Sequence, residues 1–135
     1  IFEMAQQDPL IFLFLGVFSI LIVGPTEELL FRGVIQSRLR ETFGPIVGLT
    51  FATALFAVIH IFGYGSLVGG LLGVSVLFLI GIVLAISYEY TDNLVVVAVM
   101  HGLFNATQAA FGYIGVRFGD PDSMALLVDA VLLVP

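Results

Sequence analysis

Charged residues are so sparse along this chain that the gaps between them mark long apolar segments. Three stretches contain no Asp, Glu, Lys or Arg: residues 9–26, 42–88 and 93–116. A helix that crosses the hydrocarbon core of a membrane needs about 20 residues, so the middle stretch is long enough for two helices. It divides at the glycine-rich segment 61–70, IFGYGSLVGG, which predicts a turn.

The apolar stretches are continuous and do not alternate with polar residues, which favours helices over a β-barrel. We therefore predict an all-α fold, a polytopic transmembrane bundle of about four to five helices. The expected spans are residues 9–40 (one long or broken helix), 46–62, 68–87 and 93–114, with a fifth segment that begins near Ser123. Small residues in the third span would let neighbouring helices approach closely.

A Gly24-Pro25 step interrupts the first expected span. Proline removes one helical hydrogen bond, so it either kinks the helix or restarts it. If the helix restarts here, Thr26 or Gly24 is the expected cap. Glu27 and Glu28 then fall in the first turn, where the helix dipole favours anions.

The composition agrees with a membrane protein. Of the 135 residues 60% are hydrophobic and only 10% are charged, whereas soluble domains carry about 25% charged residues. The mean hydropathy is +1.17. Because the chain has no cysteine, disulfides, thiolate zinc sites and cysteine nucleophiles are excluded. It also has no lysine and a net charge of −6, so we expect no nucleic-acid partner.

The ends of the chain suggest a piece of a larger protein, because it starts at Ile1 and its last apolar segment, 124–135, simply stops. We expect residues 1–135 to form a single core domain of a longer membrane protein. Arg38 and Arg40 lie in the loop between the first two spans. The positive-inside tendency predicts that this loop is cytoplasmic, in a protein of the cell membrane.

Ionisable residues inside membrane spans cost about 2.5–3.5 kcal/mol each on insertion scales and usually mark function. Glu28 and Arg32 are four positions apart on one helical face, with the carboxylate first, which is the favoured order. Glu27 points about 100° away from Glu28 and needs another partner. The alternative is that residues 25–41 form an amphipathic surface helix whose charges face water.

Two histidines and an asparagine are the other candidates. His60 ends the apolar run FATALFAVIH and could equally be an interfacial residue. His101 and Asn105 are four apart on one helical face, where they could also serve as a helix–helix hydrogen-bond pair.

Counting residues from the turn at Gly44-Pro45 places two of these groups at the same depth. Glu28 lies 17 residues before Pro45 and His60 lies 15 after it, so both are about 23–26 Å from the turn in straight antiparallel helices. By the same counting His101 is shallower than His60. A kink at Pro25 or a helix tilt would have to close the difference.

Such a set of polar groups suits hydrolysis. A carboxylate with a neutral histidine can bind and deprotonate water. A second histidine and an amide can donate hydrogen bonds to the oxyanion that forms on an attacked carbonyl. An arginine can hold a carboxylate, either that of its neighbour or that of a substrate terminus.

Three short motifs carry a resemblance to a known family. EELLFR at 27–32 matches an EExxxR motif, FAVIH at 56–60 matches FxxxH, and HGLFN at 101–105 matches HxxxN. Occurring in this order within residues 20–110, they resemble the CPBP intramembrane proteases, which include the type II CAAX prenyl endopeptidases and the bacterial Abi proteins.

The resemblance implies roles for these residues. Glu27, together with His60, would activate the hydrolytic water. His101 and Asn105 would stabilise the oxyanion or hold the substrate carbonyl. Glu28 would shape the site.

Arg32 would also shape the site and would lie near the C-terminal part of the substrate. The expected partners are membrane lipid and a membrane-associated protein or peptide. In the prenyl-processing branch, the substrate is a lipidated protein that loses its last three residues.

The metal dependence stays open at this point. Glu and His are credible zinc ligands, and a zinc ion would be held by Glu27, His60 and His101. An HExxH motif is absent, however, and a metal-free glutamate mechanism fits the residues equally well. The alternative function is a non-catalytic transporter core or a bacteriocin-immunity scaffold, since intramembrane carboxylates and histidines also form proton relays.

Overall fold

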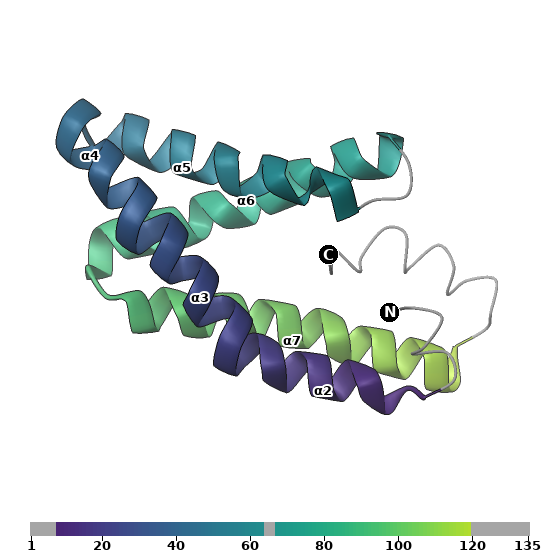
Figure 1. Cartoon of the computed structure of the whole chain (residues 1–135). Coiled ribbons are helices and arrows are strands. Elements are labelled where there is room, and N and C mark those ends of the chain that lie inside the picture. The colour runs from purple at the N-terminus through teal and green to yellow at the C-terminus, as the bar shows by residue number, and fades with distance from the viewer. Residues whose placement is uncertain (1–7, 64–66, 120–135) are drawn as a thin grey trace.

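A computed structural model describes residues 8–63 and 67–119 of the chain (Figure 1). The elements in chain order are α2 (Leu10–Phe18), the π-helical η1 (Ser19–Val23), α3 (Gly24–Glu28), the π-helical η2 (Leu29–Gln36), α4 (Ser37–Phe43), α5 (Pro45–Ile59), the 3₁₀ turn η3 (His60–Gly63), α6 (Leu67–Thr91) and α7 (Leu94–Phe118).

The prediction of an all-α membrane bundle is confirmed, since the described residues contain helices and no strand. Within the described residues, three helices are long and apolar enough to cross a membrane: Leu10–Phe43, α6 and α7. The second expected span, 46–62, corresponds to α5, which has 15 residues and is shorter than these three. The segment expected to begin near Ser123 lies outside the described residues.

The first helix runs without a break from Leu10 to Phe43, and we call it the first rod. It does not restart at Gly24-Pro25, so the caps expected for a restart are wrong: Gly24 is helical, and no side chain caps α3. The missing N–H of Pro25 is accommodated by the π-helical turn before it, where the Gly24 N–H bonds to the Ser19 carbonyl five residues back. Inserted π turns are a usual way for a helix to absorb such a defect.

Two tight turns that reverse the chain lie wholly within the described residues. Gly44 ends α4 with a positive φ of 87°, and its N–H bonds to the Arg40 carbonyl, after which Pro45 starts α5. A glycine with a positive φ, followed by a proline, is a common end for one helix and start for the next. Between α6 and α7, Asp92 has a φ of 47° and the Asn93 side chain accepts the Val95 N–H as the cap of α7.

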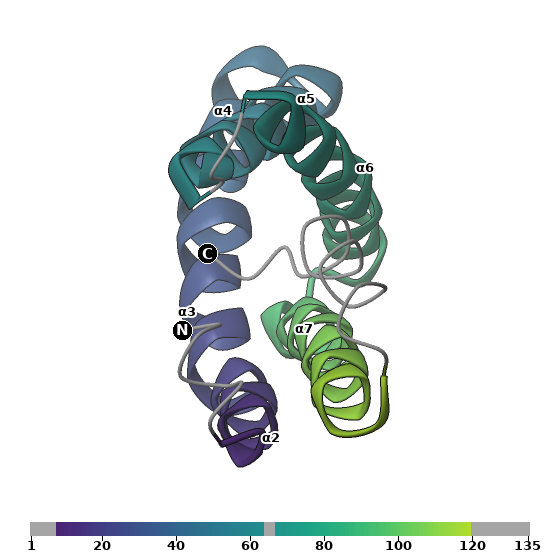
Figure 2. The ribbon, with the colours of Figure 1, turned by 90° about the vertical axis from the view of Figure 1, so that its right-hand side faces the viewer.

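The first rod connects two helix pairs. Its N-terminal part packs against α7 and its C-terminal part against α5, while α6 packs against both α5 and α7. Figure 1 shows α5 and α6 on one side and α2 and α7 on the other, with α3 crossing between them. The view in Figure 2 shows the same division from the end. The rod therefore crosses its neighbours at an angle and does not run antiparallel along all of them.

Two glycines let the first rod and α7 touch through their backbones. A Cβ atom on Gly24 would lie 2.7 Å from the Ala98 carbonyl oxygen, and one on Gly102 would lie 2.6 Å from the Ile20 Cα. Real side chains do not tolerate such distances, so larger residues would push the helices apart. This contact brings Glu28, one turn after Gly24, against His101, the residue that precedes Gly102.

The lengths of the helices show how far the contact between the rod and α7 lies from the ends of both helices. The rod is about 51 Å long at about 1.5 Å per residue, which exceeds a hydrocarbon core of about 30 Å. Its C-terminal tip carries the exposed residues Arg38, Arg40 and Glu41. His101 follows Leu94, the first residue of α7, by seven positions, which is about 10 Å.

Candidate functional site

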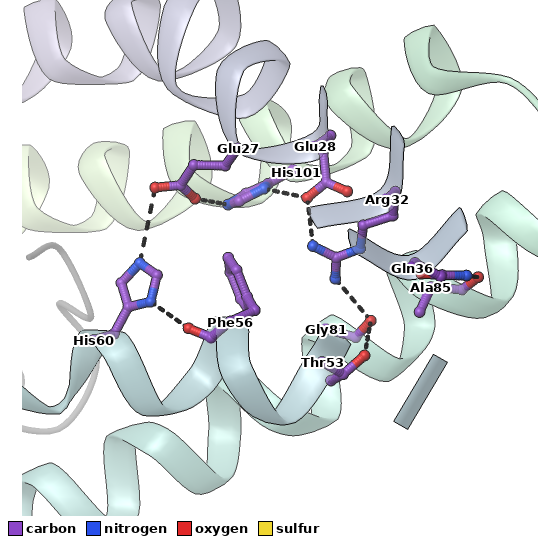
Figure 3. A network of polar contacts seen from close by, with 10 residues as sticks. All are labelled: Glu27, Glu28, Arg32, Gln36, Thr53, Phe56, His60, Gly81, Ala85 and His101. Atoms are coloured by element: carbon purple, nitrogen blue, oxygen red, sulfur yellow. Dashed lines mark hydrogen bonds and ion pairs between the residues drawn. The ribbon is translucent and has the colours of Figure 1, made fainter. Parts of the chain in front are cut away.

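A buried carboxylate, guanidinium and imidazole meet where the first rod crosses α7. Glu28 Oε1 lies 3.1 Å from Arg32 Nη1 and 2.7 Å from His101 Nδ1 (Figure 3). The exposed fractions of these three side chains are 0%, 1% and 5%. One carboxylate oxygen thus accepts from two donors on two different helices, which fixes the positions of all three groups.

Arg32 is held from both sides. Its Nη2 donates to the Gly81 carbonyl of α6 at 2.9 Å, and its guanidinium lies 5.0 Å from the centre of the Phe56 ring on α5. A cation over an aromatic face gains further electrostatic stabilisation. The interpretation of residues 25–41 as a surface helix is therefore wrong for Glu28 and Arg32. The placement of Arg32 near the C-terminal part of a substrate stays a prediction.

Glu27 occupies a different position from Glu28, as their separation around the helix predicts. Its side chain is 25% exposed, Oε1 lies 3.8 Å from His60 Nε2, and Oε2 lies 3.6 Å from His101 Nε2. Both distances are longer than a direct hydrogen bond, which spans about 2.7–3.2 Å. Figure 3 shows the carboxylate between the two imidazoles, one from α7 and one from the end of α5. A gap of this size between polar atoms suits a bridging water.

The partners of the two Nδ1 atoms define the tautomers of the histidines. His60 Nδ1 lies 2.6 Å from the Phe56 carbonyl oxygen, which can only accept, so Nδ1 carries the proton. His101 Nδ1 likewise donates to the Glu28 carboxylate. In the neutral rings both Nε2 atoms therefore carry free lone pairs, and both face Glu27.

The structure agrees with the expected depth of Glu28 and His60 and explains how His101 joins them. The rod and α5 form a hairpin at Gly44, and Glu27, the neighbour of Glu28, reaches His60 across it. His101 comes from a helix that starts at another turn, and residue counting makes it too shallow. The angle of the rod across α7 closes that difference (Figure 1).

Asn105, the sixth expected site residue, is not joined to this cluster. It lies on α7 one turn after His101, is half-buried, and makes no side-chain hydrogen bond within residues 8–63 and 67–119. The structure thus brings together five of the six candidates and places Asn105 beside them.

Whether the site can hold a metal ion depends on how its carboxylates and imidazoles are arranged. In the part of the chain that the structure describes, no group of three or more His, Cys, Asp or Glu side chains is arranged to hold a metal ion. Glu27, His60 and His101, the residues that would hold a zinc ion if one were bound, do not form such a group at the distances given above.

Three further contacts tie the rod to α6, and the residues that form them are not among the expected site residues. Gln36 Nε2 donates to the Ala85 carbonyl at 3.1 Å and to Glu89 Oε1 at 2.9 Å. Arg40 Nη1 lies 3.3 Å from Glu89 Oε2. Together with the contact between Arg32 and Gly81 they form a polar ladder, with rungs at every fourth residue of both helices. The sequence does contain a pattern that could have identified Gln36: Glu28, Arg32 and Gln36 are each four positions apart, so Gln36 extends the polar face that Glu28 and Arg32 begin.

The π-helical η2 helps to keep this face in line. Four residues of an α-helix overshoot one turn by about 40°, so side chains at this spacing drift around the helix. A π turn holds more residues than an α turn. Its presence between Leu29 and Gln36 reduces the drift, and Arg32 and Gln36 both reach α6.

Together, the fold and the site define a helical integral membrane protein with a buried carboxylate, arginine and histidine centre. A family model described as type II CAAX prenyl endopeptidase Rce1-like matches residues 9–107. The chain belongs to this family of CAAX-type intramembrane proteases, and membership implies a protease. No curated protein and no solved structure matches the chain.

Proposed function

We propose that the protein hydrolyses a peptide bond of a membrane-associated substrate with a water activated by Glu27. The observation that carries this proposal is the position of the Glu27 carboxylate between two Nε2 lone pairs, at 3.8 and 3.6 Å. A water in this gap donates one hydrogen to Glu27 and the other to an imidazole. The proposed reaction uses no metal.

Glu27, and not Glu28, is the general base. Glu28 is fully enclosed, and one of its oxygens already accepts from Arg32 and His101. Glu27 is partly exposed and has no direct hydrogen bond to another described residue. Glu28 instead orients His101, as a buried carboxylate orients the histidine of a catalytic triad.

The chemical steps follow from these assignments. Glu27 removes a proton from the water, and the remaining hydroxide oxygen attacks the peptide carbonyl carbon. The C–N bond then breaks, and the leaving nitrogen takes the proton from Glu27. The amide of Asn105 donates to the oxyanion, whereas His101 can do so only when Nε2 is also protonated, because its Nδ1 proton is bonded to Glu28.

The substrate that we propose is a prenylated CAAX-type protein. The test is to incubate the full-length protein in lipid vesicles with a farnesylated CAAX peptide and to measure tripeptide release by mass spectrometry. Glu27→Gln should lower kcat/KM by about 10²–10⁴-fold, the usual contribution of a general base. Its thermal unfolding should be unchanged, because Glu27 has no direct hydrogen bond to lose.

Controls separate the parts of this proposal. Glu41→Gln changes an exposed carboxylate on the same rod and should leave cleavage unchanged. Activity of Glu27→Gln within a few-fold of wild type would refute the base assignment. Loss of cleavage with a chelator and recovery with zinc would refute the metal-free reaction, and equal cleavage of the unprenylated peptide would refute the requirement for the lipid.

We also propose that the site opens toward the cytoplasm of a cell. His101 lies about 10 Å along α7 from the turn at Asp92, at the end of the bundle where Arg40 meets Glu89. The positive-inside tendency assigns this end to the cytoplasm. Because residues 1–135 contain no cysteine, Thr42→Cys adds one label site to this part of the protein, and the parent without the substitution is the control. A membrane-impermeant maleimide should modify it in inverted vesicles and not in intact cells, and the reverse pattern would overturn the orientation.

A further inference from the structure

Three buried polar atoms on one face of the rod lack a hydrogen-bond partner among the described residues: Glu28 Oε2, Arg32 Nε and Gln36 Oε1. They belong to consecutive positions of the four-residue pattern, and all three side chains are among the largest fully buried ones. Buried polar atoms are rarely left unpaired, because each then loses its interaction with water and gains nothing in return.

Rearrangement of these side chains cannot pair the three atoms easily, because their other ends are fixed. Arg32 is bonded through both terminal nitrogens, to Glu28 Oε1 and to the Gly81 carbonyl. Gln36 is bonded through Nε2 to Ala85 and Glu89. A rotation that satisfied one unpaired atom would break an existing contact. Figure 3 shows the second Glu28 oxygen directed away from its bonded one.

We propose that Glu28, Arg32 and Gln36 bind at least one internal water molecule. The unpaired atoms are two acceptors and one donor, and water molecules along this face of the rod can satisfy all three. A water oxygen accepts the Arg32 Nε–H, and water hydrogens go to Glu28 Oε2 and to Gln36 Oε1, through one molecule or a short hydrogen-bonded chain. Buried waters in proteins typically make about three hydrogen bonds of this kind to otherwise unpaired groups.

This site makes Gln36 a positioning residue for the reaction, a role that rests on the proposed function. The water ties the second oxygen of Glu28 to Gln36, while the first oxygen holds His101 Nδ1. His101 in turn presents Nε2 to Glu27. Gln36 is also held by α6, so it connects the orientation of His101 to the packing of the rod on α6.

The water itself is tested by a structure of the full-length protein in lipid, at a resolution that shows ordered waters. We expect density within hydrogen-bond distance of the three atoms in the wild type, and its loss in Gln36→Met, which has a similar length and no polar atom. A direct bond between Arg32 Nε and Gln36 Oε1, with no water density, would overturn the proposal. If Gln36→Met does not fold, the wild-type map alone decides.

The positioning role is tested by kinetics on the farnesylated peptide. Gln36→Met should lower kcat about 10–100-fold, the range for a hydrogen bond to a charged group, with KM within about two-fold. The matched control is Glu89→Gln, which keeps an acceptor for Gln36 Nε2 and leaves Oε1 in place, so its kcat should stay near wild type. Equal losses in both variants would overturn the role. A wild type that cleaves no peptide would refute the proposed function, and the density would still test the water site.

Discussion

Two ion pairs on the first rod have the same length and opposite surroundings. Arg32 and Glu28 lie 3.1 Å apart, and so do Arg38 and Glu41 less than two turns further on. The first pair is 1% and 0% exposed, and the second is 80% and 66% exposed. The distance between charges therefore does not distinguish a structural centre from a solvated surface pair, whereas the environment does.

The difference in burial has an energetic consequence. Exposed pairs contribute about 0–1 kcal/mol because water and salt screen them. A buried charge depends on its partner, because taking it out of water costs several kcal/mol that only the partner and further hydrogen bonds repay. Glu28 and Arg32 have such support from His101 and Gly81, and the pair at the tip of the rod has no comparable contact among the described residues.

The largest effect is expected from Arg32→Met, which leaves the buried Glu28 carboxylate without its cation. We expect the free energy of unfolding to fall by about 3–5 kcal/mol, the usual result of removing one partner of a buried pair. Reversible unfolding in mixed micelles measures it. The double variant Glu28→Met Arg32→Met should lose less than the sum of the two single variants, because no uncompensated charge remains. A sum that is simply additive would contradict this account of the pair.

A smaller loss of stability is expected from Gly81→Ala, which tests how closely α6 packs against Arg32. The new Cβ would lie 2.8 Å from Thr53 Cγ2 and 3.4 Å from Arg32 Nη2. Overpacking of this kind typically costs about 1–3 kcal/mol. Thr53→Ser removes the crowded methyl group and keeps the hydroxyl, so it should restore much of the stability in the double variant. No recovery in the same unfolding assay would mean that the backbone, and not the methyl group, limits the space.

The exposed pair supplies the control for both experiments. Arg38→Met removes the same type of side chain from the same rod, and the expected loss is below about 1 kcal/mol. A loss as large as that of Arg32→Met would contradict the conclusion that burial separates the two pairs.

Much of the fold and part of the site could be predicted from the sequence. The gaps between charges located the helices, because lipid excludes charge and the gaps match the length of a span. Counting residues from Gly44 placed Glu28 and His60 at one depth, since a tight hairpin keeps two helices in register. The family resemblance rested on three motifs, and the Rce1-like match over residues 9–107 confirms it.

The remaining features depend on how the helices cross. Counting made His101 too shallow, because residue number records distance along a helix and not its angle to others. The contact of Gln36 with Ala85 joins segments whose relative position no local pattern encodes. The sequence left open whether the helix kinks or restarts at Pro25, and it does not restart, because a π-helical turn absorbs the missing donor and leaves the helix continuous.

The ladder between the rod and α6 restricts how the length of this chain can vary. Its rungs join residues 32 with 81, 36 with 85 and 40 with 89. The two helices therefore run in the same direction, and each step of four residues along one matches a step of four along the other. One residue inserted within either helix would turn every later rung by about 100° and disconnect it. An insertion between the two helices would leave the phase of both intact. Insertions and deletions in related chains should therefore fall in the connecting loops, and not within these two helices.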